Sequence, residues 1–160
     1  MLSRFEGANN ERIVLDALLS QKLIGGNRDL ALAFQAKATL HEVKSNEYLI
    51  RQGGVDDDIY LVLSGGFEIV VNKTRVARRF ANDHVGEMAA IEPSQPRAAS
   101  VIATETSVVA KISAANLAEL GQQYPEVFRC IAKDLAKRLH QRNAHVGAAR
   151  ESIKVFVISS

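Results

Sequence analysis

Short stretches of alternating apolar and polar residues, separated by turn-forming residues, fill the middle of this chain and constrain its fold most. The alternation begins near Leu40 and ends near Ile112. Successive side chains of a β-strand point to opposite faces, so a period of two predicts strands with one buried face. Glycine and asparagine interrupt the stretches where the chain has to reverse. The sequence therefore predicts a small β-roll with an aliphatic interior.

Two pairs of strands are predicted to pair with each other through short turns. Residues 57–71 contain a strand, a glycine turn at Gly65 and a returning strand, which predicts a hairpin. Further along, the stretches 100–104 and 108–112 are predicted to pair around the polar residues 105–107. This second pair would close the strand-rich part of the chain.

Helices are predicted on both sides of the strands. Apolar residues recur at helical spacing over residues 11–24, and Asn27 is placed to cap a second helix that ends near Ala38. After the strands, Ser113 is placed to cap another helix, and a long helix is expected over residues 126–146. The predicted fold class is therefore α+β: an antiparallel β-roll of the double-stranded β-helix or jelly-roll type, flanked by N-terminal helices and a long C-terminal helix.

The composition is that of one soluble globular domain. Of 160 residues, 47% are hydrophobic and 24% are charged, which suffices for a core. The formal net charge of +2 is too small to indicate nucleic acid, because a basic footprint has to be clustered. Cys130 is the one cysteine, so it cannot form an internal disulfide. We find no apolar run long enough for a signal peptide or a membrane span, and expect a cytoplasmic protein without direct membrane or nucleic-acid partners.

The candidate binding residues stand in two strings on either side of a short polar loop: 85–91 and 96–101. We expect the two strings to face each other. Gly86 permits a close backbone approach, and a helical turn at Ala89 and Ala90 has free N–H groups that can point at an anion. Arg97 supplies paired donors suited to a phosphate, and Glu87 supplies an acceptor suited to sugar hydroxyls. One residue for each half of a nucleotide is the simplest interpretation; an ion pair that only closes the loop is the alternative.

The strings Gly-Glu-Met-Ala-Ala-Ile and Pro-Arg-Ala-Ala-Ser-Val resemble the phosphate-binding cassette of the cyclic-nucleotide-binding domain family. This family includes bacterial cyclic AMP receptor proteins and the regulatory subunits of protein kinase A. Its glutamate binds the ribose 2′-hydroxyl, its arginine pairs with the cyclic phosphate, and N–H groups of a short helix complete the anion site. The resemblance assigns the first two roles to Glu87 and Arg97, and the third to the backbone at Gly86, Met88 and Ala89.

The resemblance also bears on the base of the ligand. Ala98 stands where many members carry Ser or Thr, and it offers no hydroxyl to the phosphate or to a guanine. In the family, base-contacting side chains come from the later turns of the long helix, and by position these are Arg142 and Asn143. Polar residues near a helix end are usually just exposed, which is the alternative for this pair; in the base-contacting role, the donors and the acceptor of the two side chains would suit a pyrimidine. The expected ligand is thus a 3′,5′-cyclic nucleotide, with cyclic UMP or cyclic CMP favoured and cyclic AMP as the alternative.

The last residues indicate a further domain. Residues 153–160 are almost continuously apolar and rich in β-branched side chains, which is typical of a strand buried in a parallel sheet. They resemble the first strand of bacterial TIR-like domains that degrade nicotinamide dinucleotide in anti-phage defence. We therefore expect a cyclic-nucleotide-binding domain over residues 1–147, and over 148–160 a linker and the first strand of a missing C-terminal TIR-like domain. Many family members dimerise through the long helix, which implies a homodimer or a higher homo-oligomer.

Other functions remain open at this point. A metal enzyme of the cupin type would share the roll, but its ligands would have to come from scattered histidines: His41, His84, His140 and His145. The acidic run 56–58 is interpreted as a solvated loop, since further oxygen ligands do not follow at calcium-loop spacing. We expect no metal, no other cofactor and no catalysis in residues 1–160. A degenerate module that only dimerises, or a sensor in a transcription regulator or a channel, are the remaining alternatives.

Overall fold

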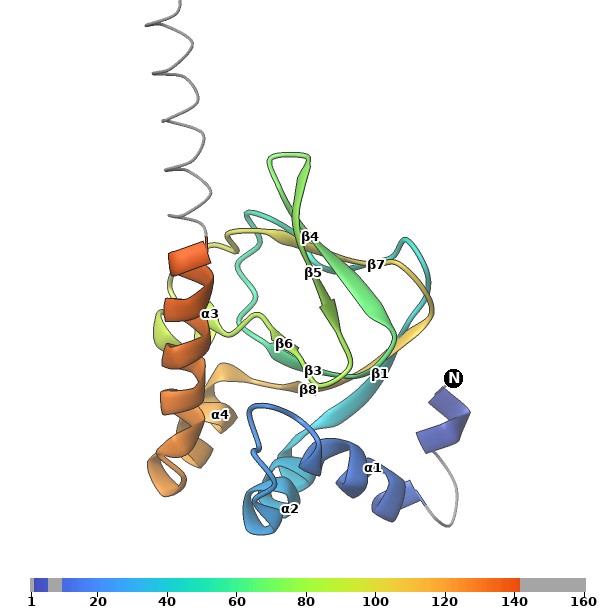
Figure 1. Cartoon of the computed structure of the whole chain (residues 1–160), viewed down its shortest axis with the longest axis vertical. Helices are drawn as coiled ribbons and strands as arrows, with labels where there is room; N and C mark the ends of the chain where they lie inside the picture. The colour runs from blue at the N-terminus through green and yellow to red at the C-terminus, as the bar shows by residue number, and fades with distance from the viewer. Residues whose placement is uncertain (1, 6–9, 142–160) are drawn as a thin grey trace, which may run out of the picture. The chain divides into compact units, whose positions relative to one another are not determined.

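Two four-stranded sheets form a β-roll in the computed structural model of the chain (Figure 1). The structure describes residues 2–5 and 10–141. The chain divides into two compact units, Met1–Val127 and Phe128–Ser160. The eight strands all belong to the first unit, as do both strings of the candidate cassette.

Every strand pairing in the roll is antiparallel. One sheet has the order β1-β8-β3-β6, and its strands are β1 (Thr39–Val43), β3 (Ile59–Ser64), β6 (His84–Val85) and β8 (Ser107–Ile112). The other has the order β2-β7-β4-β5, and its strands are β2 (Tyr48–Ile50), β4 (Gly66–Val71), β5 (Thr74–Phe80) and β7 (Ser100–Ala103). The predicted α+β fold with an antiparallel roll is confirmed.

The two predicted pairings through short turns are wrong. β3 and β4 are separated by Gly65 alone, yet β3 pairs with β6 and β8, whereas β4 pairs with β5 and β7. Gly65 has a φ of 96°, a conformation that glycine adopts readily, and here it takes the chain from one sheet into the other. β7 and β8 also lie in different sheets. Both short connections are therefore corners of the roll, because the apolar faces of both sheets have to meet in one interior.

Apolar side chains from both sheets fill the interior of the roll. They form one cluster: Val43, Ile50, Tyr60, Val62, Phe67, Val85, Val101, Ala103 and Val109. Phe67 of β4 and Val62 of β3 are completely buried in it. This cluster confirms the predicted aliphatic interior, and it anchors β6, the strand that leads into the cassette.

Among the described residues of the first unit, four α-helices and one 3₁₀ helix accompany the strands. They are η1 (Leu2–Phe5), α1 (Asn10–Leu19), α2 (Arg28–Lys37), α3 (Met88–Ile91) and α4 (Ala114–Gln123). The caps were predicted correctly: Asn27 accepts a hydrogen bond from Leu30 N at the start of α2, and Ser113 accepts one from Asn116 N at the start of α4.

The first helix is shorter than predicted. α1 ends at Leu19, and residues 20–26 form turns. Gln21 explains the early end, since its buried side chain donates from Nε2 to the carbonyl oxygen of Val62, 3.0 Å away in β3. This hydrogen bond holds residue 21 against β3. A continued helix would not keep the side chain of Gln21 at this position.

A further helix occupies residues 126–141, and most of it belongs to the second unit. Its predicted start near residue 126 is confirmed, while the predicted end at Val146 lies outside the described residues. Within this helix, Arg138 Nη2 and Asp134 Oδ2 are 2.7 Å apart, an ion pair between successive turns.

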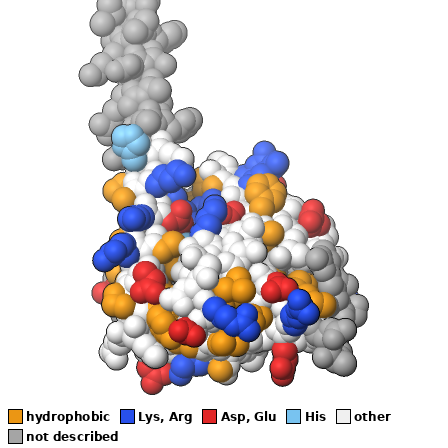
Figure 2. Space-filling view, turned by 60° about the horizontal axis from the view of Figure 1, so that its bottom comes forward, with side chains coloured by type: hydrophobic (Ala, Val, Ile, Leu, Met, Phe, Trp, Pro, Cys, Tyr) orange, Lys and Arg blue, Asp and Glu red, His pale blue; other side chains and the backbone are white. Residues whose placement is uncertain are grey.

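The surface carries charges of both signs. On the face drawn in Figure 2, basic and acidic side chains of the described residues are interspersed over the molecule. On this face, the described residues therefore form no cluster of positive charge of the kind that binds a phosphate backbone. Among residues 2–5 and 10–141, no helix is both long enough and apolar enough to cross a membrane.

Candidate functional site

The first string of the cassette forms the end of a strand, a glycine and a short helix. β6 leads into Gly86, and α3 begins after Glu87. Gly86 has a φ of 83°, and a Cβ atom there would lie 2.8 Å from the carbonyl oxygen of Asp58 and 3.0 Å from Nη1 of Arg97. Glycine at this position is therefore what allows the arginine and the neighbouring loop to reach the backbone.

Arg97 is buried, with 8% of its surface exposed, and three acceptors hold its guanidinium group. Nη1 donates to the carbonyl oxygen of Gly86 at 3.2 Å. Nη2 donates to Oδ2 of Asp56 at 2.8 Å and to the carbonyl oxygen of Asp58 at 2.6 Å. Nε is also buried and has no hydrogen-bond partner among the described residues. The two strings do face each other as predicted, and Arg97 joins them.

The backbone of Arg97 is held as firmly as its side chain. Its N–H donates to the carbonyl oxygen of Gly54 at 2.8 Å, and its carbonyl oxygen accepts from Gly53 N at 2.8 Å. These bonds tie the second string of the cassette to the loop between β2 and β3. The same loop carries Asp56, so one short segment positions both the arginine and its carboxylate partner.

The acidic run was predicted as a solvated loop, and Asp56 does lie exposed in the loop between β2 and β3, where its carboxylate also pairs with Arg97. The hydrogen bond from Arg97 lowers the pKa of Asp56, while partial burial acts in the opposite direction. Asp58 is linked to β8, since its Oδ2 lies 3.6 Å from Nζ of Lys111. Burial, followed by the negative charges of Asp58 and Asp56, raises the pKa of Tyr60 to about 12. Arg97 is thus bound by the carboxylate of Asp56 and by the backbone carbonyl oxygen of Asp58, whose own carboxylate lies beside Lys111.

We expect the Asp56–Arg97 pair to make stability depend on pH in the acid range. The pKa of Asp56 is below its ordinary value of 3.8 in the folded chain, so its ionised form stabilises the fold above that value, and this contribution is lost as the pH falls through the folded pKa. Asp56→Asn should therefore have a lower free energy of unfolding than the unsubstituted chain near neutral pH, and the difference should shrink below about pH 4. Urea unfolding of both proteins at a series of pH values measures this; a difference that stays constant into strong acid would contradict it.

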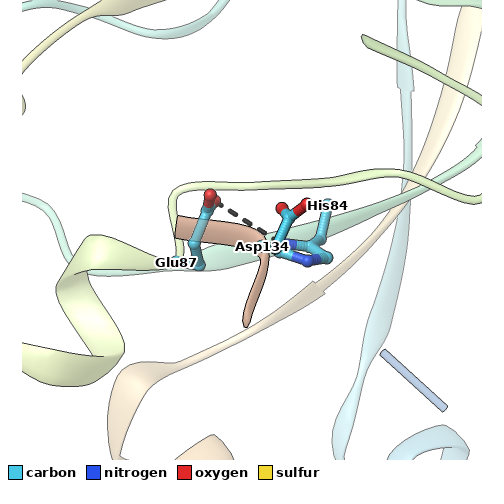
Figure 3. A group of neighbouring side chains, drawn as sticks. All are labelled: His84, Glu87 and Asp134. Carbon is cyan, nitrogen blue, oxygen red and sulfur yellow. Dashed lines mark ion pairs between the residues drawn. The ribbon is translucent and has the colours of Figure 1, made fainter. Parts of the chain in front are cut away.

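Glu87 lies beside Gly86 in the chain and pairs with a histidine (Figure 3). Its Oε2 is 3.5 Å from Nδ1 of His84, and both side chains are almost completely buried. The alternative in which Glu87 and Arg97 close the loop as an ion pair is not what the structure shows, because Arg97 forms its ion pair with Asp56. Sequence reasoning had treated His84 as one of several scattered histidines, although its position three residues before Glu87 was a usable signal.

The remaining predicted residues differ in their placement. Met88 is half exposed, Ala89 is buried and Ala98 is exposed. The N–H of Ala89 donates to the carbonyl oxygen of Gly86 at 3.2 Å, and that of Ala90 to the carbonyl oxygen of Glu87 at 3.0 Å. The expectation of free N–H groups on these two alanines is therefore wrong, since so short a helix uses them in its own turn.

The two residues predicted to contact the base, Arg142 and Asn143, lie outside the described residues. Of the cassette residues, the structure brings Arg97 directly onto Gly86, with Glu87 as the next residue of the chain. Sequence reasoning missed Asp56 as the partner of Arg97. The acidic run itself was visible, but its partner is 41 residues away in the sequence.

Fold and site together define a β-roll domain in which a strand, a glycine and a short helix are joined to a buried arginine. The family of such domains can be named from comparison with known proteins, because the model of the cyclic nucleotide-binding domain matches residues 40–124. The chain belongs to the cyclic nucleotide-binding domain family, as its cassette predicted.

Relatives resemble the chain along its whole length. It is 49% identical over 160 residues to the Pycsar effector protein BcPycTIR of Burkholderia cepacia, which covers 100% of this chain and 53% of the relative. Identity to the Pycsar effector protein PaPycTIR of Pseudomonas aeruginosa is 41% over 160 residues, covering 100% of this chain and 52% of the relative. The chain thus spans about half the length of the curated relatives it matches.

Among solved structures, the catabolite activator protein of Thermus thermophilus superposes with a TM-score of 0.70 at 21% identity. The match covers 79% of this chain and 62% of that chain. At this level of identity the likeness supports the fold alone.

Proposed function

We propose that the chain is the sensor domain of a bacterial defence effector and binds a 3′,5′-cyclic pyrimidine nucleotide, cyclic UMP or cyclic CMP. The observation that carries this proposal is the buried guanidinium of Arg97, which is held against Gly86 next to Glu87 in a member of the cyclic nucleotide-binding domain family. A buried arginine whose Nε–H has no hydrogen-bond partner among the described residues is a donor suited to a phosphate oxygen.

Each cassette residue has a role in this proposal. Arg97 pairs with the cyclic phosphate, and Glu87 accepts a hydrogen bond from the ribose 2′-hydroxyl. Gly86, Met88 and Ala89 place the backbone of α3 beside the phosphate. Ala98 follows the arginine as an exposed small residue and adds no hydroxyl. The site therefore binds one anionic group and one sugar, and a cyclic nucleotide contains both in a single molecule.

Pyrimidine selectivity is the finer part of the proposal. Arg142 and Asn143 would present donors and an acceptor to the edge of a uracil or cytosine. The relatives named above are called Pycsar effector proteins and match all of the chain, which supports the role as the sensor of an effector. Cyclic AMP, sensed in an ordinary signalling protein or transcription regulator, is the second candidate, and it is favoured by 25% identity over 119 residues to the cAMP-activated global transcriptional regulator CRP of Salmonella typhimurium.

In this proposal, ligand binding to the domain changes the activity or the assembly of a C-terminal effector domain. Residues 148–160 would be the linker and first strand of a TIR-like domain, which in the whole protein would hydrolyse NAD. The names of the relatives contain TIR, and about half of their length lies beyond the part that this chain matches. A ligand shifts such a coupling only if it binds one arrangement of the long helix better than another. A homodimer or larger homo-oligomer formed through that helix is the expected assembly.

Calorimetric titration of the 160-residue chain with 3′,5′-cyclic UMP, CMP, AMP and GMP tests the proposal. We expect one of the two pyrimidine nucleotides to bind most tightly. Preference for cyclic AMP would keep the site and replace the pyrimidine by the second candidate. The control is circular dichroism, which shows whether the protein is folded. If the folded protein gives no heat of binding with any of the four nucleotides, the chain is a degenerate module and the proposal is overturned.

A further inference from the structure

The cation of the cassette is already partly neutralised within the chain. Nη2 of Arg97 and Oδ2 of Asp56 are 2.8 Å apart, and the side chain of Asp56 is 45% exposed while that of Arg97 is 6% exposed. The carboxylate therefore sits between the buried guanidinium and solvent. The hydrogen bond from Arg97 lowers the pKa of Asp56 further below neutral pH, so the carboxylate is ionised there, as it would be at its ordinary pKa.

The edge of the Arg97 guanidinium formed by Nε and Nη2 carries Asp56 and still has one N–H group that can receive a phosphate oxygen. Nη2 has two N–H groups, and the carboxylate of Asp56 and the carbonyl oxygen of Asp58 occupy them. Nε has one N–H group, which is buried and has no partner among the described residues. Nε and Nη2 belong to the same rigid planar fork, so an oxygen bound by Nε lies close to whatever Nη2 holds. A ligand phosphate at Nε is thus a near neighbour of the Asp56 carboxylate.

Cyclic and linear nucleotides differ in charge at this point. A 3′,5′-cyclic phosphate is a diester and carries a single negative charge at every physiological pH. A linear nucleoside monophosphate is a monoester whose second pKa is about 6, so it carries a charge between about −1.5 and −2 at pH 7. The repulsion between a carboxylate and the ligand grows with the ligand's charge, and it is strong over a few ångströms in a partly buried site.

We propose that Asp56 is a specificity-determining residue, whose carboxylate makes the cassette select the singly charged cyclic phosphate over the doubly charged phosphate of linear nucleoside monophosphates. This inference rests on the proposed function, because it concerns the same phosphate site. The carboxylate lowers the affinity for any anion, and it lowers the affinity for a dianion more. A sensor built in this way ignores the linear nucleotides that share its base and sugar.

A purely orienting role for Asp56 leads to a different result. If Asp56 only held the guanidinium in place, an asparagine oxygen at the same position would still accept the hydrogen bond from Nη2. Any loss of orientation would weaken the binding of cyclic and linear nucleotides by the same factor. The ratio of the two dissociation constants therefore separates discrimination by charge from orientation.

The experiment compares the unsubstituted chain with Asp56→Asn and with Asp57→Asn, a matched loss of charge from the neighbouring residue of the same loop. For each protein, dissociation constants are measured for cyclic UMP, uridine 5′-monophosphate and uridine 3′-monophosphate, and for the corresponding cytidine and adenosine compounds. The quantity compared is the dissociation constant of the linear nucleotide divided by that of the cyclic nucleotide, for the base whose cyclic nucleotide binds most tightly. Thermal unfolding of each variant establishes that it is folded.

We expect Asp56→Asn to lower this ratio about tenfold, because the affinity for the linear nucleotides should increase more than the affinity for the cyclic one. Asp57→Asn should leave the ratio within about twofold of that of the unsubstituted chain. An unchanged ratio in Asp56→Asn, with cyclic nucleotide still bound, would overturn the inference and leave the proposed function standing. A folded, unsubstituted chain that binds none of the cyclic nucleotides would overturn both.

Discussion

Replacing Arg97 by alanine is expected to weaken cyclic-nucleotide binding about ten- to a hundredfold or more, because the ligand loses a charge-assisted contact that typically contributes about 1.5–3 kcal/mol. The loss has a second cause in the fold. The guanidinium also holds the carbonyl oxygens of Gly86 and Asp58, so its removal loosens the glycine that starts the cassette. Calorimetry with the preferred cyclic nucleotide measures the effect.

Two further variants make the Arg97 result specific. Arg97→Lys keeps the positive charge but lacks the planar fork, and we expect it to recover only part of the affinity. Arg78→Ala removes an exposed arginine of β5 with the same change in net charge, and binding should stay within about twofold. Equal losses in Arg97→Ala and Arg78→Ala would mean that a general positive field attracts the ligand, and the specific role of Arg97 would have to be abandoned.

Gly65→Ala is expected to cause a large loss of stability in the roll. Gly65 has a φ of 96°, and a Cβ atom there would lie 2.0 Å from Oγ, 2.5 Å from Cβ and 2.7 Å from Cα of Ser107. The serine cannot rotate away from contacts that involve its own backbone. Strain at such a φ costs about 1–3 kcal/mol, and the steric overlap adds to it, so the free energy of unfolding should fall by about 3 kcal/mol or more. Urea unfolding followed by circular dichroism measures this loss.

Gly53→Ala is the matched control for the crowding at Gly65. Gly53 also has a positive φ, of 81°, but a Cβ atom there would have nothing within 4 Å. Its substitution should therefore cost only the strain of the backbone, about 1–2 kcal/mol. Similar losses in the two variants would show that the contact with Ser107 is not what requires glycine at the corner between β3 and β4.

Sequence reasoning was most accurate where neighbouring residues decide the structure. A helix cap needs only a side-chain oxygen and an N–H two or three residues later, so Asn27 and Ser113 could be recognised from their local context. The cassette is equally local: strand, glycine and short helix follow one another over residues 84–91. The family followed from these strings, and the alternation of apolar residues indicated a roll with an aliphatic interior.

Only the tertiary structure decided which strands pair and what Arg97 binds. The alternation of a strand shows which residues are buried but not the partner strand, so β3 and β4 look like a hairpin until the two sheets close over a shared core. The Asp56–Arg97 contact likewise joins a loop and a string that lie 41 residues apart. Caps and turns are short-range interactions and can be read from the sequence, whereas sheet pairing and ion pairs across the fold depend on the closure of the roll.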